Sequence, residues 1–170
     1  MIVTLTESEW VIATHIAHLR QAQNKSAGLP DQRQSKAVDQ ISINYAREIA
    51  VCKSLNFFPD LEFMRPGIAD ASYRGRTIDV KKMTPMVMNV RVKPGKRSDI
   101  YVGCAYEAET HVFDIVGFTY HDRLEQQMQE YRIENTDGTH YFSIPIAKLF
   151  PISKIDDCVD WMDGLLEKPE

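Results

Sequence analysis

The segment Asp70-Ala71-Ser72-Tyr73-Arg74-Gly75-Arg76-Thr77-Ile78-Asp79-Val80-Lys81 predicts a β-hairpin that carries a pair of acids and a lysine. With Arg74-Gly75 as a two-residue turn, Asp70 lies directly opposite Asp79 on the neighbouring strand. Opposed residues share one face of a sheet, with Cβ atoms about 4.5–5.5 Å apart, so these carboxylates repel one another unless a cation lies between them. Lys81 follows Asp79 by two residues and projects from the same face. Gly75 could also form a β-bulge, which would shift the register by one residue.

The helix predicted before this hairpin, over residues 31–55, contributes a third acid. Ile41, Tyr45, Glu48 and Cys52 recur at the spacing i, i+4, i+7 and i+11, which places them on a single helical stripe. Because the other members of the stripe are apolar or partly apolar, we expect Glu48 to face inward. The alternative is a residue at the edge of the helix that reaches solvent or a salt bridge.

Three carboxylates and a lysine on converging faces are typical of a site for a hard divalent cation. Mg²⁺ prefers a few carboxylates together with water and phosphate oxygens. The ion can lower the pKa of a bound water and polarise a phosphodiester oxygen, while a nearby ammonium stabilises the negative charge that develops. The pattern therefore indicates Mg²⁺-dependent phosphodiester chemistry, with Mn²⁺ as a substitute.

Asp70 followed by Asp79-Val80-Lys81 resembles the PD-(D/E)XK signature of the restriction-endonuclease-like nuclease superfamily, which includes phage-encoded and microbial enzymes. The resemblance extends from about Ser42 to Leu124, and it departs from the signature at Ala69, where the signature has proline. It implies an α/β (α+β) fold with a restriction-endonuclease-like core, in which a central mixed β-sheet is flanked by helices.

By this resemblance, Asp70, Asp79 and the backbone carbonyl of Val80 bind the metal. Glu48 binds it directly or through water, and Lys81 assists the nucleophilic water. The implied catalytic residues are therefore Lys81, Asp79, Asp70 and Glu48. The implied activity is that of a deoxyribonuclease, with an endonuclease as the expected type. Many members cut duplexes as homodimers, so the resemblance allows a homodimer.

Basic residues are concentrated in and after the hairpin: residues 74–97 include eight bases and one acid. Such a cluster can grip the phosphate backbone of DNA, although charge runs are also common on solvated loops. The residues predicted to contact nucleic acid are Arg74, Arg76, Lys82, Arg91, Lys93, Lys96 and Arg97. Pro85, Pro94 and Gly95 lie within the segment Met83–Arg97 and predict a flexible loop there.

The remaining pattern predicts a single domain over residues 1–170. Residues 1–30 would hold an N-terminal helix that begins after Thr6 and ends near Gln23. Residues 31–124 would form the nuclease-like core, and residues 125–170 a C-terminal strand and helix. Period-two patterns predict strands at Ile68–Tyr73, Arg76–Met83, Asp99–Tyr106, His111–Phe118 and Tyr141–Ile144. Helical patterns predict helices at His121–Tyr131 and Asp156–Leu166.

Composition bounds the class of protein. The net charge of −4 excludes a generally basic protein that coats nucleic acid. No apolar run approaches the roughly 20 residues of a membrane span, and the start MIVTLTESEW lacks the features of a secretory signal. Cys52, Cys104 and Cys158 are odd in number and far apart, which fits a reducing compartment. We therefore expect an intracellular, cytoplasmic protein that is not bound to a membrane.

Two other functions fit parts of this pattern. A catalytically silent module on the same fold would bind nucleic acid through the basic segment, and its carboxylates would be structural. An interaction protein would present its acidic C-terminal helix to a partner. Ile155, Val159, Met162 and Leu166 recur at helical spacing in that helix, but such a stripe could equally pack on its own domain.

Overall fold

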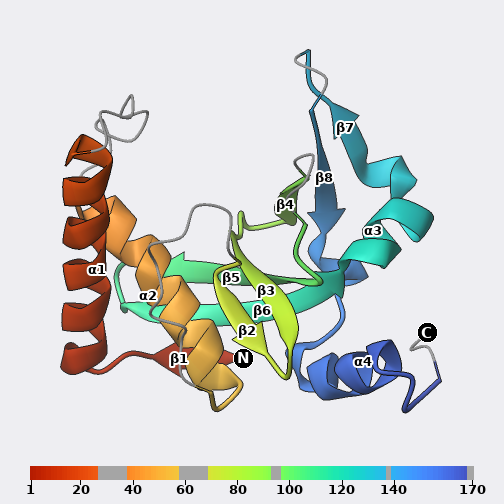
Figure 1. Cartoon of the computed structure of the whole chain (residues 1–170), viewed down its shortest axis with the longest axis horizontal. Coiled ribbons are helices and arrows are strands. Elements are labelled where there is room, and N and C mark those ends of the chain that lie inside the picture. The colour runs from red at the N-terminus through yellow and green to blue at the C-terminus, as the bar shows by residue number, and fades with distance from the viewer. Residues whose placement is uncertain (27–37, 58–68, 93–96, 137–138, 168–170) are drawn as a thin grey trace.

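The computed structural model describes residues 1–26, 38–57, 69–92, 97–136 and 139–167, and these form a mixed α+β arrangement. Its main sheet (Figure 1) has the strand order β1 (Ile2–Thr4), β6 (Val112–Tyr120), β5 (Ile100–Glu107), β3 (Arg76–Lys82) and β2 (Ala71–Tyr73). Strands β3 and β5 pair in parallel, and the other neighbours pair antiparallel. The prediction of an α/β chain with a central mixed sheet flanked by helices is confirmed in this general form.

Helices α1 (Glu7–Ser26) and α2 (Val38–Ser54) lie side by side and flank the main sheet (Figure 1). Helix α1 begins with a reciprocal capping box, because the Glu9 carboxylate accepts from the Thr6 backbone N–H at 2.6 Å and the Thr6 hydroxyl accepts from the Glu9 N–H at 3.3 Å. The predicted N-terminal helix is thus confirmed, and it continues three residues beyond Gln23. The start of the second predicted helix, residues 31–37, lies outside the described residues.

Two hydrophobic cores lie on opposite faces of the main sheet. Ile100 and Val102 of β5 are fully buried in the first core, which α2 covers. Tyr101, between them, points to the other face and belongs to the second core with Leu124 and Phe142. A second sheet, of order β4 (Val87–Val92), β8 (His140–Pro145) and β7 (Arg132–Glu134), and helix α3 (His121–Gln127) contribute to this second core.

The segment Met83–Arg97, predicted to be a flexible loop, instead contains strand β4, and that prediction was wrong for the described part. Met88 and Val90 alternate with exposed Asn89 and are fully buried, because β4 pairs with β8 far along the chain. The prolines lie outside β4 and do not interrupt it. Residues 93–96 lie outside the described residues.

The C-terminal helix α4 (Ile155–Met162) is shorter than predicted. It ends before Gly164, which adopts a φ of +75° that favours glycine. Ile155 and Val159 are buried in the first core, so this part of the apolar stripe packs on its own domain. Of the predicted strand Ile68–Tyr73, residue 68 lies outside the described residues and Ala71–Tyr73 forms β2. The other predicted strands and the helix after His121 are confirmed with small shifts of their ends. Strands β1 and β7 and the 3₁₀ helices Gln129–Tyr131, Ile146–Lys148 and Ile152–Lys154 were not predicted.

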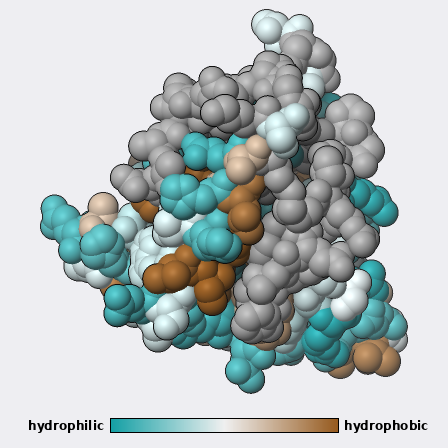
Figure 2. All heavy atoms as spheres, turned by 60° about the vertical axis from the view of Figure 1, so that its left-hand side comes forward, coloured by the Kyte–Doolittle hydropathy of each residue, from teal (hydrophilic) through white to brown (hydrophobic). Residues whose placement is uncertain are grey.

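The surface of the described residues is mixed in polarity. Figure 2, which brings the α1 side of the molecule forward, shows a small hydrophobic area beside hydrophilic residues. Val11 and Leu19 on α1 are 62% and 46% exposed. No helix in the described ranges has the length and apolar character that crossing a membrane requires.

Candidate active site

The turn of the β2–β3 hairpin forms as the sequence predicts. Arg74 and Gly75 have φ values of +49° and +80°, the left-handed pair that a two-residue type I′ turn requires. Tyr73 then pairs with Arg76, Ser72 with Thr77 and Ala71 with Ile78, so no bulge shifts the register. Asp70 immediately precedes this ladder, and the same register brings it opposite Asp79.

The carboxyl groups of Asp70 and Asp79 lie close enough to interact with one another. The Oδ2 atom of Asp70 also accepts from the backbone N–H of Val80 at 2.8 Å, which ties the start of β2 to β3. Burial, together with the charge of Asp79, raises the pKa of Asp70 to about 7. Ionising both carboxyl groups is costly because their negative charges repel. A cation bound between them would stabilise the doubly ionised pair.

Lys81 lies on the same face of the sheet as this carboxyl pair. Its Nζ atom forms a salt bridge with Asp79, and the two side chains are 20% and 26% exposed. The Nζ atom also lies 5.9 Å from the centroid of the Tyr101 ring, on the adjacent strand β5. Asp79 is directly beside Tyr101 in the parallel register, which explains why these side chains share a face.

Glu48 lies on a different element. It is half-buried on α2, the helix that covers the face of the sheet opposite to Asp79 and Lys81. Burial raises the pKa of Cys52, one turn further along α2, to about 12, and the charges of Glu48 and Asp70 add to this effect. Within the described ranges, no three His, Cys, Asp or Glu side chains are gathered closely enough to hold a metal ion. Glu48 as a third ligand therefore stays a prediction.

The donor atoms that are present fit a hard cation. Asp70 and Asp79 offer oxygen ligands of the type that Mg²⁺ prefers, and Mg²⁺ commonly takes one or two protein carboxylates and completes its shell with water and phosphate oxygens. Burial is the largest cause of the raised pKa of Asp70, and the charge of Lys81 offsets it only in part. The carbonyl of Val80, predicted as a further ligand, follows directly on Asp79.

Two of the predicted DNA contacts bind acids of helix α4. Arg74 forms salt bridges with Asp156 at 3.1 Å and with Asp160 at 2.5 Å. Arg76 pairs with Asp163 and donates to the carbonyl oxygen of Met162 at 2.9 Å. These contacts anchor α4 to the hairpin. The aspartates also neutralise the positive charge of the two arginines, which would otherwise attract a phosphate.

The other predicted DNA contacts differ in how far the structure describes them. Lys82, Arg91 and Arg97 are exposed. Arg91 donates to the Thr139 hydroxyl at 3.3 Å. Lys93 and Lys96 lie outside the described residues. A role of any of these residues toward DNA stays a prediction.

Sequence reasoning did not place Tyr101, Asp99 or His121 near the predicted site. The Oδ2 atom of Asp99 accepts from the backbone N–H and the hydroxyl of Thr77, at 2.8 and 2.7 Å, and these bonds join β5 to β3. The Tyr101 hydroxyl lies 3.2 Å from Nδ1 of His121. The available signal was Asp99, a polar residue directly before the buried strand β5. Its place near the site depends on the parallel register of β3 and β5, which the local sequence does not reveal.

The chain was compared with models of protein families, with curated proteins and with solved structures, and no match was found in any of the three.

Proposed function

We propose that this protein is a metal-dependent nuclease that hydrolyses phosphodiester bonds in DNA, on a fold of the restriction-endonuclease-like kind. The observation that carries the proposal is the contact between the Asp70 and Asp79 carboxyl groups, with Lys81 bound to Asp79. A hairpin that presents two carboxylates and a lysine on one face has the composition of a PD-(D/E)XK site. The five-stranded mixed sheet with α2 on one face supports the same assignment.

In this function Asp70, Asp79 and the Val80 carbonyl would hold Mg²⁺ or Mn²⁺, with Glu48 contributing directly or through water. The bound ion would supply an acidified water and a polarised phosphate oxygen. Lys81 orients the attacking water and stabilises the negative charge that develops on the phosphate, because its ammonium group is held beside Asp79. The exposed bases Lys82, Arg91 and Arg97 contact the DNA backbone.

The test is cleavage of circular and linear, single- and double-stranded DNA with Mg²⁺ or Mn²⁺. Lys81→Ala should lower the rate by about 100-fold or more, as expected for a group that acts on the nucleophile or the developing charge. Its free energy of unfolding should stay within about 1 kcal/mol of the parent. Lys148→Ala, which removes an exposed lysine outside the hairpin, is the matched control and should leave the rate unchanged. Undiminished metal-dependent cleavage by Lys81→Ala refutes the proposed role.

A second candidate is a nucleic-acid-binding module without catalysis, and it is favoured by the absence of a three-ligand metal group among the described residues. Calorimetric titration with Mn²⁺ separates the two functions. If the protein is a nuclease, it has a metal site that Asp79→Asn weakens, so Mn²⁺ should bind the parent more tightly than the variant. In thermal denaturation, Mn²⁺ should then raise the melting temperature of the parent and not that of the variant. A module of the second kind binds DNA without such a site.

A further inference from the structure

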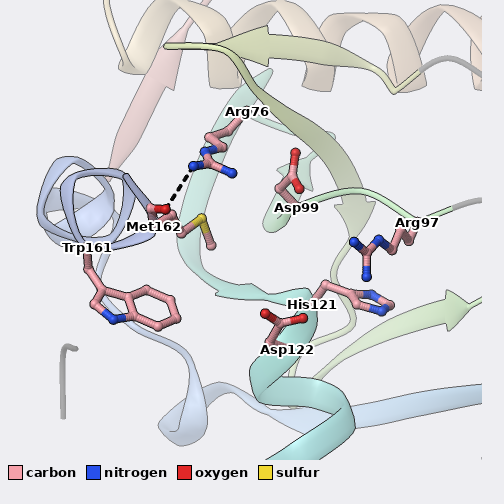
Figure 3. A pocket seen from close by; sticks show the side chains of 7 residues that line it. All are labelled: Arg76, Arg97, Asp99, His121, Asp122, Trp161 and Met162. Carbon is pink, nitrogen blue, oxygen red and sulfur yellow. Dashed lines mark hydrogen bonds between the residues drawn. The ribbon is translucent and has the colours of Figure 1, made fainter. Parts of the chain in front are cut away.

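A cavity of about 310 Å³ lies at the start of β3 and β5, a volume at the lower end of those that hold small ligands (Figure 3). Arg76 and Asp99 border it from β3 and from the residue before β5. His121 and Asp122 border it from the start of α3, and Trp161 and Met162 from the end of α4. Arg97 completes the wall beside His121 (Figure 3).

Contacts from Lys81 through Tyr101 lead to His121 in the cavity wall. Tyr101 lies beneath the Nζ atom of Lys81, and its hydroxyl lies 3.2 Å from Nδ1 of His121 in the cavity wall. Asp99 shares the face of Asp79, because β5 runs parallel to β3 with Asp79 beside Tyr101. Arg76 in the cavity wall and Asp79 in the carboxyl pair are three residues apart on β3, about 10 Å along the strand. A DNA strand bound at the carboxyl pair would therefore bring an adjacent nucleotide to the cavity.

The cavity wall has groups that can bind an anion and a surface on which a planar ring can stack. Arg97 is exposed and has a guanidinium suited to a phosphate. In the tautomer whose Nδ1 accepts a hydrogen bond from the Tyr101 hydroxyl, Nε2 of His121 carries the ring hydrogen and can donate to the same anion. The half-buried indole of Trp161 provides a surface on which a base can stack.

The acids of the wall restrict what can bind. Burial alone would raise the pKa of Asp99, but the hydrogen bonds from Thr77 and the neighbouring arginines lower it below its ordinary value, so this carboxylate stays charged. Asp99 and Asp122 thus repel a simple anion that enters the cavity. A ligand with an anionic end and a hydrogen-bond donor at the other end satisfies both kinds of group, and the amino groups of cytosine, adenine and guanine are such donors.

We infer that this cavity is a subsite for one unpaired nucleotide of the DNA strand next to the bond that is cut, with its phosphate on Arg97 and His121 and its base on Trp161. The inference rests on the proposed function for the identity of the ligand. It assigns the subsite a preference for a base with an exocyclic amino group, accepted by Asp99 or Asp122. Arg76, already paired with Asp163, shapes the wall rather than binding the phosphate.

The direct test uses the fluorescence of Trp161. The chain has two tryptophans, so Trp10→Phe leaves Trp161 as the sole emitter. Titration with deoxycytidine 5′-monophosphate in EDTA should give a saturable change in emission, and thymidine 5′-monophosphate should bind more weakly. Arg97→Gln should raise the Kd about tenfold, the loss expected for one charge-assisted hydrogen bond. Arg132→Gln, at an exposed arginine of β7 outside the cavity, is the matched control and should leave the Kd unchanged.

Calorimetric titration of the unaltered chain gives the same comparison if Trp10→Phe does not fold. The inference is overturned if neither nucleotide binds, if inorganic phosphate binds as well as the nucleotides, or if Arg97→Gln and Arg132→Gln behave alike. Cleavage separates this inference from the proposed function. Nucleotide binding without metal-dependent cleavage supports the subsite and refutes the nuclease. Cleavage whose KM and kcat are unaffected by Arg97→Gln supports the nuclease and refutes the subsite.

Discussion

The ammonium group of Lys81 lies over the aromatic ring of Tyr101, 5.9 Å from its centroid, although the two residues are on different strands. The parallel pairing of β3 with β5 produces this contact, because it sets Tyr101 beside Asp79 and two residues from Gly103, the strand neighbour of Lys81. Tyr101 is 2% exposed and belongs to the second core. The residue therefore supports the lysine from below and links it to His121 on the other side.

Substitution of Tyr101 should separate its packing from its hydroxyl. Tyr101→Phe keeps the ring and removes the contact with His121, so the free energy of unfolding should fall by about 1 kcal/mol. Tyr101→Ala also removes a buried aromatic ring and should cost about 3–5 kcal/mol. Urea denaturation of the three proteins measures both losses. Equal losses in the two variants would contradict a packing role for the ring.

The carboxyl pair makes stability depend on pH in the metal-free protein. The pKa of Asp70 is about 7 in the folded chain and about 3.9 in an unfolded one, so the folded chain holds an extra proton between these values. The contribution of Asp70 to the free energy of unfolding therefore falls as the pH rises from about 4 to about 7, and then levels off. Asp70→Asn removes this pH-dependent loss of stability, because asparagine does not ionise. Its side-chain oxygen can still accept the hydrogen bond from the Val80 backbone N–H. The stability of the variant relative to the parent should increase from pH 4 to pH 7.5, as measured by urea denaturation in EDTA.

Asp99 provides a control of opposite sign. Its folded-state pKa is lowered, against the effect of burial, by the hydrogen bonds from Thr77 and by the nearby arginines. The stabilisation is therefore present above the unfolded pKa and is lost as the pH falls through the folded one. Asp99→Asn should cost more stability at pH 7 than at pH 3. Parallel pH profiles for Asp70→Asn and Asp99→Asn would contradict both assignments.

The acids of α4 should weaken DNA binding by occupying Arg74. Its guanidinium pairs with Asp156 and Asp160, and the Tyr73 hydroxyl also donates to Asp156 at 2.7 Å. The double variant Asp156→Asn/Asp160→Asn should bind DNA more tightly and should show a steeper loss of affinity with salt, because Arg74 becomes available to a phosphate. These ion pairs lie at the surface and contribute little to folding, so the free energy of unfolding should stay close to that of the parent.

A matched pair controls for the change in net charge. Glu107→Gln/Glu109→Gln removes the same charge from exposed residues at the end of β5 and in the turn that follows. Fluorescence anisotropy with labelled duplex DNA at several salt concentrations compares the two double variants. If both raise the affinity equally, the effect comes from net charge and Arg74 has no special part in it.

The sequence was sufficient where the determinants are local. The Arg74-Gly75 turn fixes the hairpin register within four residues on either side, and the Thr6–Glu9 capping box fixes the start of α1. It failed where pairing is distant. Strand β4 pairs with β8, as Met88 does with Ile144, and the loop prediction followed from the flanking Pro85, Pro94 and Gly95 and not from the strand itself.

Two further features were hidden for the same reason. Tyr101 reaches Lys81 through the register of β3 and β5, which the hydrogen bonds between Asp99 and Thr77 hold in place. Arg47, which helical periodicity places off the inward stripe of α2, is 5% exposed and donates to Asn44 at 2.8 Å. Burial lowers the pKa of Arg47. Asn44, which accepts its side-chain hydrogen bond, is uncharged. Periodicity gives the face of a helix but not what other elements cover it.

Two glycines of the main sheet should tolerate a methyl group to different degrees. A Cβ atom at Gly103, the strand neighbour of Lys81, would lie 2.6 Å from the sulfur of Met83 and 3.2 Å from that of Met88. Both are ends of flexible side chains that can move. A Cβ atom at Gly117 would lie 2.5 Å from the backbone oxygen of Phe150, which pairs with Phe118 and cannot move alone. Gly117→Ala should therefore lower the free energy of unfolding by about 1–3 kcal/mol and by more than Gly103→Ala does. Thermal and urea denaturation of the two variants test this order, and a greater loss for Gly103→Ala would show that the methionines beside the hairpin are packed more rigidly than the backbone at Phe150.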